Sequence, residues 1–484
     1  MRPSFVASAL GIILLAFGAI VLIPIVFSGG DNRLILPFLT ASAVSFILGL
    51  ACRLFGKLNR NFDTIKHTEG LLIVTFTWVV TAGIGAIPYL FFGLSPVDAY
   101  FESVSGFTTT GATILADFAP YPKAFFFWRD LTQWLGGMGI IVLFVAILPQ
   151  LGVAGRKIFF TEAPGPTDDK FTPRVAHTAK ALWLIYLLLT ILQVVLLVAA
   201  GMPIFDAVCN AFGTMAAGGF SPHPQSIMGY QSPTITWITT VFMVLAGANF
   251  ALQYKCFLKG KFRVLFTNEE FLFYLAITAS ASLLCAAFLW GQQASSLNDS
   301  LRDGMFQVVS ILTTTGFCSA DFALWLVPAQ TVLFAVMLVG GCAGSAGGGV
   351  KVVRVLFTAK FLKREIDRIV HPKAILPIRI DKATVPDDIQ RQILGFLLFY
   401  LILLLASGLV VTMIEQNAVT GFVGTAATLG NIGPGFGEIG PMGSFAGLHW
   451  TSKTIFIVDM IVGRLELIPF LAMLCPEFWT MGRN

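Results

Sequence analysis

Long, almost uninterrupted apolar stretches dominate this chain and limit the folds that it can adopt. A helix needs about 20 mostly apolar residues to cross the hydrocarbon core of a bilayer. Ten segments meet this condition: 4–27, 34–54, 69–93, 124–150, 181–201, 233–256, 270–290, 328–357, 392–415 and 453–475. Only 12% of the 484 residues are charged, whereas a soluble domain typically carries about 25%. The sequence therefore predicts an all-α membrane protein with ten transmembrane spans.

The distribution of lysine and arginine predicts how these spans are oriented. If the first residue is cytoplasmic, 25 of the 31 Lys and Arg residues fall on the inner side, five on the outer side and one, Arg464, inside a span. This agrees with the positive-inside rule, so we expect both termini in the cytoplasm. Eleven acidic residues give the outer side a net charge of −6, against +12 inside. A negative outer face attracts cations to a pore mouth, although an ordinary topological charge bias explains the same counts.

Residues suited to catalysis, metal binding or disulfide formation are scattered. The seven cysteines have no CxxC spacing and the five histidines form no cluster, so neither a disulfide scaffold nor a zinc site is expected. A membrane enzyme would need clustered His, Asp or Glu in the bilayer, and away from the span ends the sequence offers only Asp459, Arg464 and Glu466. We therefore expect a protein that is not an enzyme and needs no cofactor.

Four of the predicted outer connections share one pattern. Aligned on a glycine without gaps, they read DAYFESVSGFTTTG (98–111), DAVCNAFGTMAAGG (206–219), DGMFQVVSILTTTG (303–316) and TGFVGTAATLGNIG (420–433). The glycines are 108, 97 and 117 residues apart, and each loop lies between two predicted spans. The repeat predicts four units, each a helix, a loop with a short helix, and a second helix, after an extra N-terminal pair of spans.

Each of these loops begins like a short helix and ends like an extended chain. Ser95 and Pro96 supply an N-cap and a proline at the first helical position of the first loop, and Pro203 lies near the corresponding point of the second. Non-helical backbone is tolerated at membrane depth only where it lines a cavity or is buried in protein. We expect four re-entrant loops on a central axis, with carbonyl oxygens that replace the hydration shell of a cation such as potassium. Ordinary extracellular loops are the alternative.

Glycine at the aligned position has a physical purpose. Because it adopts φ > 0 readily, it lets successive carbonyl oxygens point the same way. The residues expected to bind the ion are Thr109, Thr110, Gly111, Ala217, Gly218, Gly219, Thr314, Thr315, Gly316, Asn431, Ile432 and Gly433. The second loop has alanines in place of the threonines and the fourth is also irregular, so we expect the pore to be only pseudo-fourfold.

The eighth predicted span contains six glycines within residues 340–349, GGCAGSAGGG. A glycine costs about 1 kcal/mol relative to alanine inside a helix, so we expect an irregular loop beneath the four re-entrant loops. Close helix packing of the small-xxx-small kind, which Gly340 and Gly344 satisfy, is the alternative. The three consecutive glycines 347–349 exceed what packing needs and favour the loop.

Arg464 lies near the midpoint of the last predicted span, and a charge inside a membrane indicates a functional position. Asp459 and Glu466 are at i−5 and i+2, not at the i±3 or i±4 spacings that share a helix face. We therefore expect the partner of Arg464 on another segment or in an aqueous pore, with a buried ion pair as the alternative.

Together these motifs resemble the Trk/Ktr/HKT superfamily of potassium transporters, most closely its TrkH branch. The resemblance covers nearly the whole chain and rests on the four loops, with TTTGF (313–317) and GNIGPGFG (430–437) among the more distinctive, and on WLGGMGI (134–140). The N-terminal pair of spans resembles the extension that separates TrkH from KtrB. In the superfamily, glycine at all four positions accompanies potassium preference, and serine in the first accompanies sodium permeation. The resemblance therefore implies a potassium-uptake protein of the bacterial inner membrane.

The resemblance also implies a gate. In the family, a glycine-rich intramembrane loop obstructs the pore, and an arginine of the fourth inner helix faces the pore below the filter as an electrostatic barrier. The residues that match these two elements here are Gly344, Ser345, Ala346, Gly347, Gly348, Gly349 and Arg464.

The partners implied by the resemblance are a second copy of the chain, as a homodimer, and a cytosolic nucleotide-binding regulatory subunit of the TrkA type. Segment 351–391 has ten basic residues and little apolar periodicity. It is either a plain positive-inside loop, which also contacts anionic membrane lipids, or part of the face that docks the regulatory subunit. The chain has no GxGxxG motif followed by a helix and an acidic residue, so it should bind no nucleotide itself, and we expect no nucleic acid partner.

The complete prediction is four helix–pore-loop–helix repeats in a pseudo-fourfold arrangement around a pore. The expected parts are an N-terminal two-helix extension, 1–66, and pore repeats 67–155, 156–262, 263–375 and 376–484. The competing hypothesis is a secondary transporter with broken helices that carries another cation or solute, which explains the glycine-rich segment and Arg464 but not four matched loops. Channel-like flux and proton- or sodium-coupled transport are both compatible with the motifs.

Overall fold

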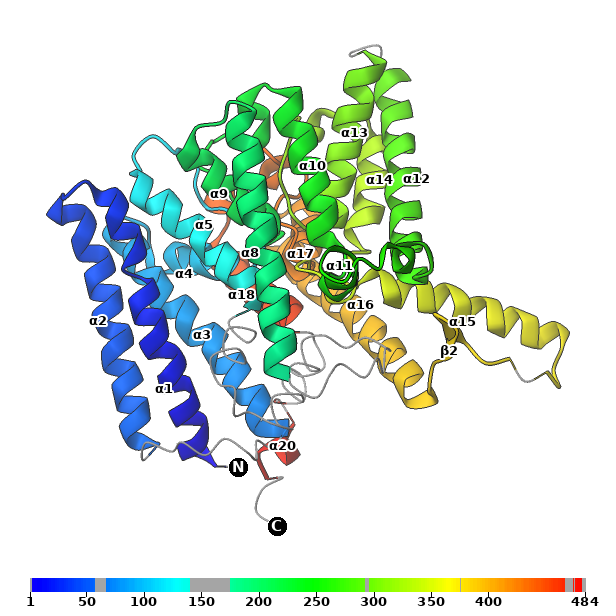
Figure 1. Cartoon of the computed structure of the whole chain (residues 1–484), viewed down its shortest axis with the longest axis horizontal. Coiled ribbons are helices and arrows are strands. Elements are labelled where there is room, and N and C mark those ends of the chain that lie inside the picture. Colours follow the sequence, from blue (N-terminus) through cyan, green and yellow to red (C-terminus); the bar gives the residue numbers. More distant parts are fainter. Residues whose placement is uncertain are drawn as a thin grey trace.

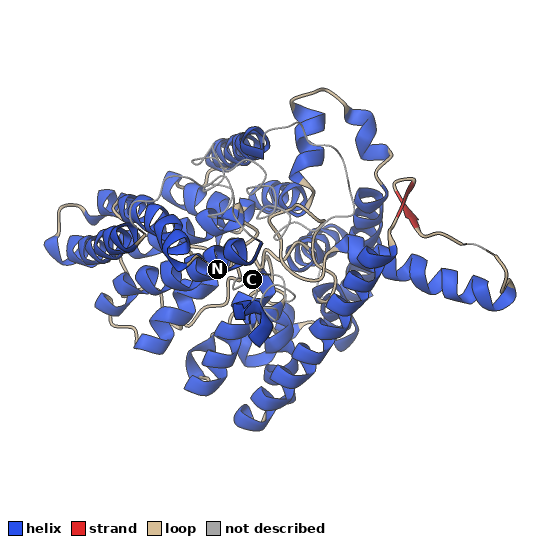
Figure 2. Ribbon diagram, turned by 90° about the horizontal axis from the view of Figure 1, so that it is seen from below, coloured by secondary structure: helices blue, strands red, loops and turns tan. Residues whose placement is uncertain are grey.

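The computed structural model describes residues 2–56, 67–139, 175–291, 296–374, 376–465, 473 and 475–480. In these ranges the chain is mostly helical, and its two short strands, β1 (Arg379–Ile380) and β2 (Ala383–Thr384), pair antiparallel. The helices form one bundle, seen from the side in Figure 1 and from below in Figure 2, and α15 (Val352–Val370) projects from it.

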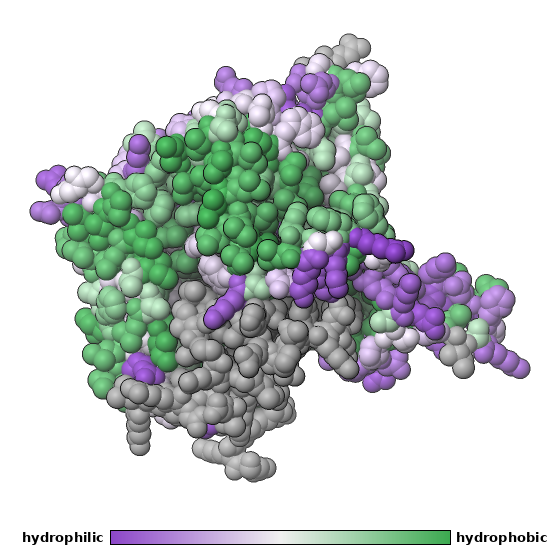
Figure 3. Space-filling model, viewed as in Figure 1, coloured by the Kyte–Doolittle hydropathy of each residue, from purple (hydrophilic) through white to green (hydrophobic). Residues whose placement is uncertain are grey.

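Among the described residues, six helices are long and apolar enough to cross a membrane. They are α1 (Pro3–Ile20, continued by η1, Ile23–Ser28), α2 (Asn32–Phe55), α3 (His67–Phe91), α8 (Val175–Ala199), α12 (Glu269–Gly291) and α16 (Asp387–Glu415). They coincide with the predicted spans 4–27, 34–54, 69–93, 181–201, 270–290 and 392–415. Hydrophobic side chains cover the outside of α1, α2 and α8 (Figure 3), as contact with lipid requires. The protein is therefore a multi-pass membrane protein.

Two further predicted spans, 124–150 and 453–475, are described mainly in their first parts. Those parts form α5 (Lys123–Gly137) and α18 (Trp450–Arg464), and most of the residues that follow lie outside the described ranges. Trp128 of α5 is fully buried, and its indole nitrogen donates a hydrogen bond to the carbonyl oxygen of Gly85 on α3 at 3.0 Å. This contact joins α5 to the helix that opens the first repeat.

The predicted spans 233–256 and 328–357 are not continuous helices. The elements that replace them are α10 (Pro233–Gly247), α11 (Phe250–Phe257), α14 (Val327–Met337) and α15. α10 and α11 differ in direction by 107°, and Asn249 caps α11 by accepting hydrogen bonds from the amides of Ala251 and Leu252. Residues 338–351 are non-helical and separate α14 from α15, as the glycine content of this segment predicts. We call them the glycine-rich loop.

A short helix follows the first long helix of each repeat. These four helices are α4 (Pro96–Phe107), α9 (Ile204–Met215), α13 (Leu297–Leu312) and α17 (Ala418–Leu429). α4 packs on α3, α9 on α8, α13 on α12 and α17 on α16, so the same pairing occurs four times. As predicted, Ser95 caps α4 with Pro96 in its first turn, and Pro203 occupies the N-cap position of α9.

The N-terminal helices α1 and α2 pack on one another and against α3, at the edge of the bundle (Figure 1). Ser42 and Ser45 of α2 donate hydrogen bonds to the carbonyl oxygens of Gly18 and Leu14 of α1, both at 2.7 Å. The interface therefore contains small residues and interhelical hydrogen bonds, which are typical of helix pairs in membranes.

Segment 351–391 differs from the sequence-based interpretation of a loop with little periodicity. Its first half forms α15, with Leu362, Ile366 and Ile369 exposed at i, i+4 and i+7 spacing, on one side of a helix whose other residues include many Lys and Arg. Hydrophilic residues accordingly dominate the visible face of this projection (Figure 3). The remaining short elements are η2 (Ser226–Tyr230), η3 (Phe262–Phe266), η4 (Phe322–Leu324), η5 (Gly437–Ile439), η6 (Phe445–Gly447) and α20 (Pro476–Thr480).

Candidate functional site

Each short helix ends in the same hydrogen-bonded turn. In each turn, the amide two residues before the aligned glycine donates a hydrogen bond to the carbonyl oxygen three residues earlier in the chain. The amide one residue before the glycine donates to the carbonyl oxygen five residues earlier. The first set is Thr109 to Gly106, Ala217 to Thr214, Thr314 to Ile311 and Asn431 to Thr428. The second set is Thr110 to Ser105, Gly218 to Gly213, Thr315 to Ser310 and Ile432 to Ala427. The gap-free alignment of the four sequences is therefore also a structural register. We call residues 108–111, 216–219, 313–316 and 430–433 the turn segments.

The backbone of the turn segments alternates in the sign of φ. At the position two before the aligned glycine, φ is +53° for Thr109, +54° for Ala217, +60° for Thr314 and +53° for Asn431. The aligned glycines have φ of +81° (Gly111), +76° (Gly219), +81° (Gly316) and +100° (Gly433), and the residue between has a negative φ. This alternation lets successive carbonyl oxygens face one side. A positive φ in a β-branched threonine costs about 1–3 kcal/mol, and strain of this kind is often found at functional sites.

The four aligned glycines form a closed ring of contacts. At each of them a Cβ atom would lie less than 3.0 Å from a carbonyl oxygen of the next turn segment. The pairs are Gly111 with Gly218, Gly219 with Thr315, Gly316 with Ile432 and Gly433 with Thr110. The fourth pair returns to the first segment, so the segments surround one axis in sequence order. Each position therefore requires glycine for two reasons: its φ is positive, and no side chain fits there. We call the four residues the glycine ring.

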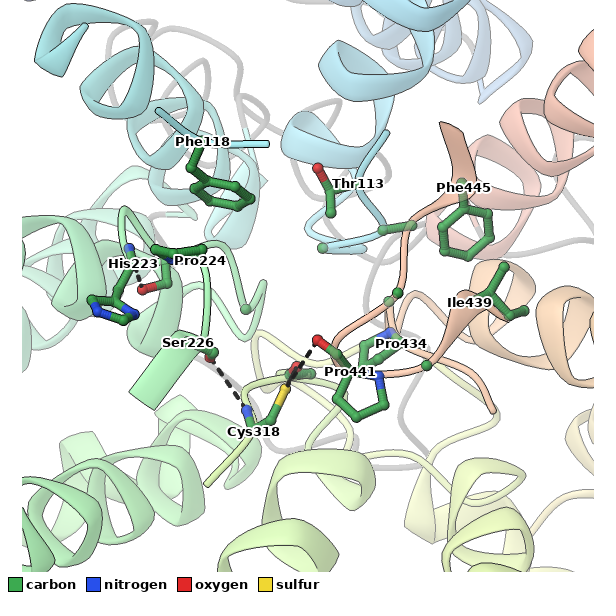
Figure 4. Close-up of a pocket in the computed structure, with 18 of the residues that line it drawn as sticks. Thr113, Phe118, His223, Pro224, Ser226, Cys318, Pro434, Ile439, Pro441 and Phe445 are labelled. Carbon is green, nitrogen blue, oxygen red and sulfur yellow. Dashed lines mark hydrogen bonds between the residues drawn. The ribbon is translucent and has the colours of Figure 1, made fainter. Parts of the chain in front are cut away.

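A cavity of about 70 Å³ opens on one side of the glycine ring. All four ring glycines line it, together with residues that follow them in the chain, among them Thr113, His223 and Cys318. Figure 4 shows that these residues come from all four repeats and surround a common opening. We call this cavity, which the four ring glycines line, the vestibule.

An ion pair that the sequence analysis did not single out borders this vestibule. Arg129 of α5 lines the cavity, and its Nε donates to Glu102 Oε1 of α4 at 2.5 Å, with 3% and 0% of the two side chains exposed. The guanidinium also lies 3.5 Å from the centre of the Phe220 ring and bonds to the carbonyl oxygen of Ser221 at 3.2 Å. The pair thus links α4, α5 and the chain that leaves the second turn segment. Because Glu102 and Arg129 are 27 residues apart in the chain, no local sequence pattern predicts this ion pair.

The glycine-rich loop contacts the turn segments from the other side. The amide of Gly348 donates to Thr314 Oγ1 at 2.7 Å. A Cβ at Gly347 would lie 2.7 Å from the carbonyl oxygen of Thr313, and one at Gly348 would lie 2.6 Å from that of Gly430. These residues precede the ring glycines, whereas the vestibule is lined by the ring and by residues after it. The loop and the vestibule therefore flank the ring.

Not every predicted gate residue lies against the turn segments. Gly344 packs near Asn249, and its carbonyl oxygen accepts a hydrogen bond from the Phe250 amide at 3.0 Å. Ser345 donates to the carbonyl oxygen of Cys342 within its own loop at 2.7 Å. These two residues fasten the loop to α11 and to itself, while Gly347 and Gly348 make the close approach.

Arg464 connects the glycine-rich loop to the first repeat. Nη1 donates to the carbonyl oxygen of Ala346 at 2.9 Å, and Nη2 donates to those of Gly136 and Gly137 at 2.8 and 3.2 Å. These partners lie on other segments, as the spacing of the nearby acidic residues predicts. Asp459 accepts a hydrogen bond from Ser407 at 2.9 Å, and Glu466 lies outside the described residues.

Other kinds of site are not supported by the geometry. In the ranges that the structure describes, no three His, Cys, Asp or Glu side chains are grouped as a metal site would require. The polar groups that converge in the turn segments are backbone carbonyls, threonine hydroxyls and the side-chain amide of Asn431. The Nδ2 atom of Asn431 donates a hydrogen bond to Thr110 Oγ1 at 3.0 Å. Oxygen ligands without a carboxylate suit a weakly held monovalent cation.

Comparison with known proteins agrees with the resemblance noted in the sequence. Residues 41–477 match the TrkH family model, described as "Cation transport protein". The Trk system potassium uptake protein TrkH of Salmonella typhimurium is 38% identical over 479 residues, which cover 97% of this chain and 98% of that protein. The Trk system potassium uptake protein TrkG of Escherichia coli is 34% identical over 421 residues, 86% of each chain.

A solved structure is similar over the whole length. The crystal structure of the potassium transporter TrkH from Vibrio parahaemolyticus has a TM-score of 0.89 and 35% sequence identity, and covers 99% of this chain and 100% of that chain. These matches confirm the family resemblance, and with it the expectation of a transport protein rather than an enzyme. The chain belongs to the TrkH family of cation transport proteins.

Proposed function

We propose that this protein takes up potassium ions across the bacterial inner membrane, through a pore bounded by the four turn segments. The observation that carries the proposal is the closed glycine ring, because such a ring requires backbone from all four repeats around one axis. The relatives described above are named as potassium uptake or potassium transporter proteins, which supports potassium as the cargo.

The turn segments act as the selectivity filter in this proposal. Carbonyl oxygens aligned by the alternating φ values would replace water around a dehydrated potassium ion, and the twelve residues predicted from the sequence would supply them. The C-termini of α4, α9, α13 and α17 lead directly into these segments, so the negative ends of four helix dipoles favour a cation there. The ion is the substrate, and no cofactor is involved.

The glycine-rich loop and Arg464 act as the gate. The loop lies against the third and fourth turn segments on the side away from the vestibule, where it would obstruct an ion that has passed the ring. Arg464 fastens that loop to α5 and adds a positive charge to the same region. Opening then requires the loop to leave Thr314 and Arg464 to release Ala346.

The membrane arrangement follows from this assignment. α5, the bent pair α10–α11, the interrupted pair α14–α15 and α18 would complete ten spans around four re-entrant loops, in the parts 1–66, 67–155, 156–262, 263–375 and 376–484. The start of α1 and helix α20 lie at the same end of the molecule (Figure 1). This supports a cytoplasmic position for both termini, on the side rich in Lys and Arg.

The proposed partners are a second copy of the chain and a cytosolic nucleotide-binding subunit of the TrkA type. The relatives are named as parts of a Trk system, which supports an assembly of several subunits. Helix α15 projects from the bundle with exposed basic residues such as Lys363 and Arg368, and so offers a surface outside the membrane core to a subunit or to anionic lipid.

Growth of a potassium-uptake-deficient bacterium on low-potassium medium tests the function. We expect the wild-type chain to restore growth and Gly316→Ala to restore it poorly, because a Cβ at Gly316 overlaps the carbonyl oxygen of Ile432 and forces the third and fourth turn segments apart. Gly395→Ala is the matched control, since Gly395 of α16 has open space at its Cβ position and no positive φ. A wild-type chain that is present in the membrane but moves no potassium, in cells or in liposomes, would refute the proposal.

A further inference from the structure

The second turn segment lacks side chains that the first and third possess. Immediately before the ring glycine stand Thr110 and Thr315 in those two, and their hydroxyls bond to the hydroxyls of Thr108 and Thr313 at 2.7 and 2.8 Å. The second segment has Gly218 at this position, preceded by two alanines. Two consecutive glycines, 218 and 219, leave this segment the least constrained by its own sequence.

The carboxamide of Gln133 fills the space of the missing side chain. A Cβ atom at Gly218 would lie 2.5 Å from Cδ, 2.6 Å from Oε1 and 2.8 Å from Nε2 of Gln133. Gln133 is fully buried on α5, 85 residues from Gly218 in the sequence. Gly218 has no positive φ, so its backbone accepts a side chain, and the three heavy atoms nearest to its Cβ position all belong to Gln133.

Both ends of this carboxamide are hydrogen-bonded to the second segment. Nε2 donates to the carbonyl oxygen of Gly218 at 2.5 Å, and Oε1 accepts from the amide of Phe220 at 2.9 Å. The two contacts lie on either side of the ring residue Gly219. The Gly218 carbonyl is also the oxygen that faces Gly111 in the ring, so Gln133 acts directly on a ring contact.

We propose that Gln133 is a positioning residue for ion selectivity, which supplies to the second turn segment the polar side chain that its own sequence lacks. The inference rests on the proposed function, since it assigns Gln133 a part in potassium selection. Discrimination between potassium and sodium depends on the number and placement of carbonyl oxygens. Without Gln133 the Gly218 carbonyl is free to rotate, and the ring loses a fixed ligand on one of its four sides.

The test compares sodium and potassium flux in proteoliposomes. In Gln133→Met the side chain keeps its length and loses both hydrogen bonds, and in Gln133→Ala it also leaves a void. We expect the ratio of sodium to potassium flux to rise by about tenfold in both, the fold-change equivalent to the lost hydrogen bond that fixes the Gly218 carbonyl. Gln193→Ala is the control, because Gln193 is equally buried and bonds to Thr214 of α9 at 2.8 Å without reaching the turn segment.

A double substitution separates ion selection from simple folding. Gly218→Thr alone should disrupt transport, because the new Cβ overlaps Gln133. Combined with Gln133→Ala it should restore potassium preference, since the side chain is then supplied from within the segment. If the single variants do not reach the membrane, the double variant alone tests the inference. A double variant that does not prefer potassium over sodium overturns it.

Different results would refute the role of Gln133 and the proposed function. A wild-type protein that moves no potassium in the same liposomes refutes the proposed function. A wild-type protein that prefers potassium, together with a Gln133→Met variant of unchanged preference, refutes only the role of Gln133.

Discussion

The guanidinium of Arg464 and the carbonyl oxygen of Ala346, 2.9 Å apart, join the end of α18 to the glycine-rich loop. The same side chain reaches the carbonyl oxygens of Gly136 and Gly137 at the end of α5. A guanidinium has five N–H donors in a fixed plane and can serve two segments at once. On its other side the loop is bonded through Gly348 to Thr314, so it is attached both to the turn segments and to Arg464.

Arg464→Ala should increase potassium flux through the protein. The substitution removes the charge-assisted hydrogen bonds to the loop, each worth about 1.5–3 kcal/mol, and so favours arrangements in which the loop has moved away. We expect basal flux in liposomes to rise by about tenfold or more. Arg464→Lys, with fewer and differently directed donors, should give an intermediate rise. An unchanged potassium flux in Arg464→Ala would show that this residue is not part of the gate.

Gly111→Ser should weaken the preference for potassium. Gly111 has a φ of +81°, and a Cβ there overlaps the carbonyl oxygen of Gly218, so the first and second turn segments must move apart. We expect sodium uptake relative to potassium uptake to increase by about tenfold, the effect of roughly 1.4 kcal/mol. Gly83→Ser is the control, because Gly83 on α3 has open space at its Cβ position. Equal ion preference in the two variants would count against the ring as the selective element.

The register of the four turn segments could be predicted from the sequence because its cause is local. The positive φ at Gly111 and its equivalents requires glycine after each short helix, so the sequence of every repeat contains a glycine at this position. The break after α14 was predictable for the same reason, since Gly347, Gly348 and Gly349 do not sustain a helix.

Contacts that depend on distant segments were not predictable. Gln133 meets Gly218 across 85 residues, and nothing near either position in the sequence indicates the other. The bend between α10 and α11 is hidden in an apolar stretch, because hydropathy does not register a cap such as Asn249. Helix α15 was missed because its few exposed apolar residues are outnumbered by charges, and only its helical spacing reveals them.

The carboxyl group of Asp299, in the first turn of α13, should contribute to stability in a pH-dependent way. Its pKa is lowered, first by the hydroxyl of Ser296, which donates to it at 2.8 Å, and then by the charge of Arg302. Because the pKa is lower in the folded than in the unfolded chain, this contribution is present above the unfolded pKa and is lost as pH falls through the folded pKa. Ser296→Ala should therefore lower the melting temperature at neutral pH, and by less in strong acid. An equal decrease at both pH values would contradict this assignment.

The buried pair of Glu102 and Arg129 should behave as one unit in a double-mutant cycle. Glu102→Gln leaves the Arg129 charge without its carboxylate in a buried site, which we expect to cost about 3 kcal/mol. Arg129→Met leaves the carboxylate with Thr113 and the amide of Ile114 as hydrogen-bond donors, and should cost a similar amount. The measurement is the thermal unfolding of purified protein in detergent.

The combined variant decides whether the two losses share one cause. With both charges of the pair removed, neither member leaves the other without its partner, so the double variant should be more stable than the sum of the single losses predicts, by about 1–3 kcal/mol. Additive losses would mean that the two side chains stabilise the protein independently, and the 2.5 Å contact would then not be what holds α4 against α5 beside the vestibule.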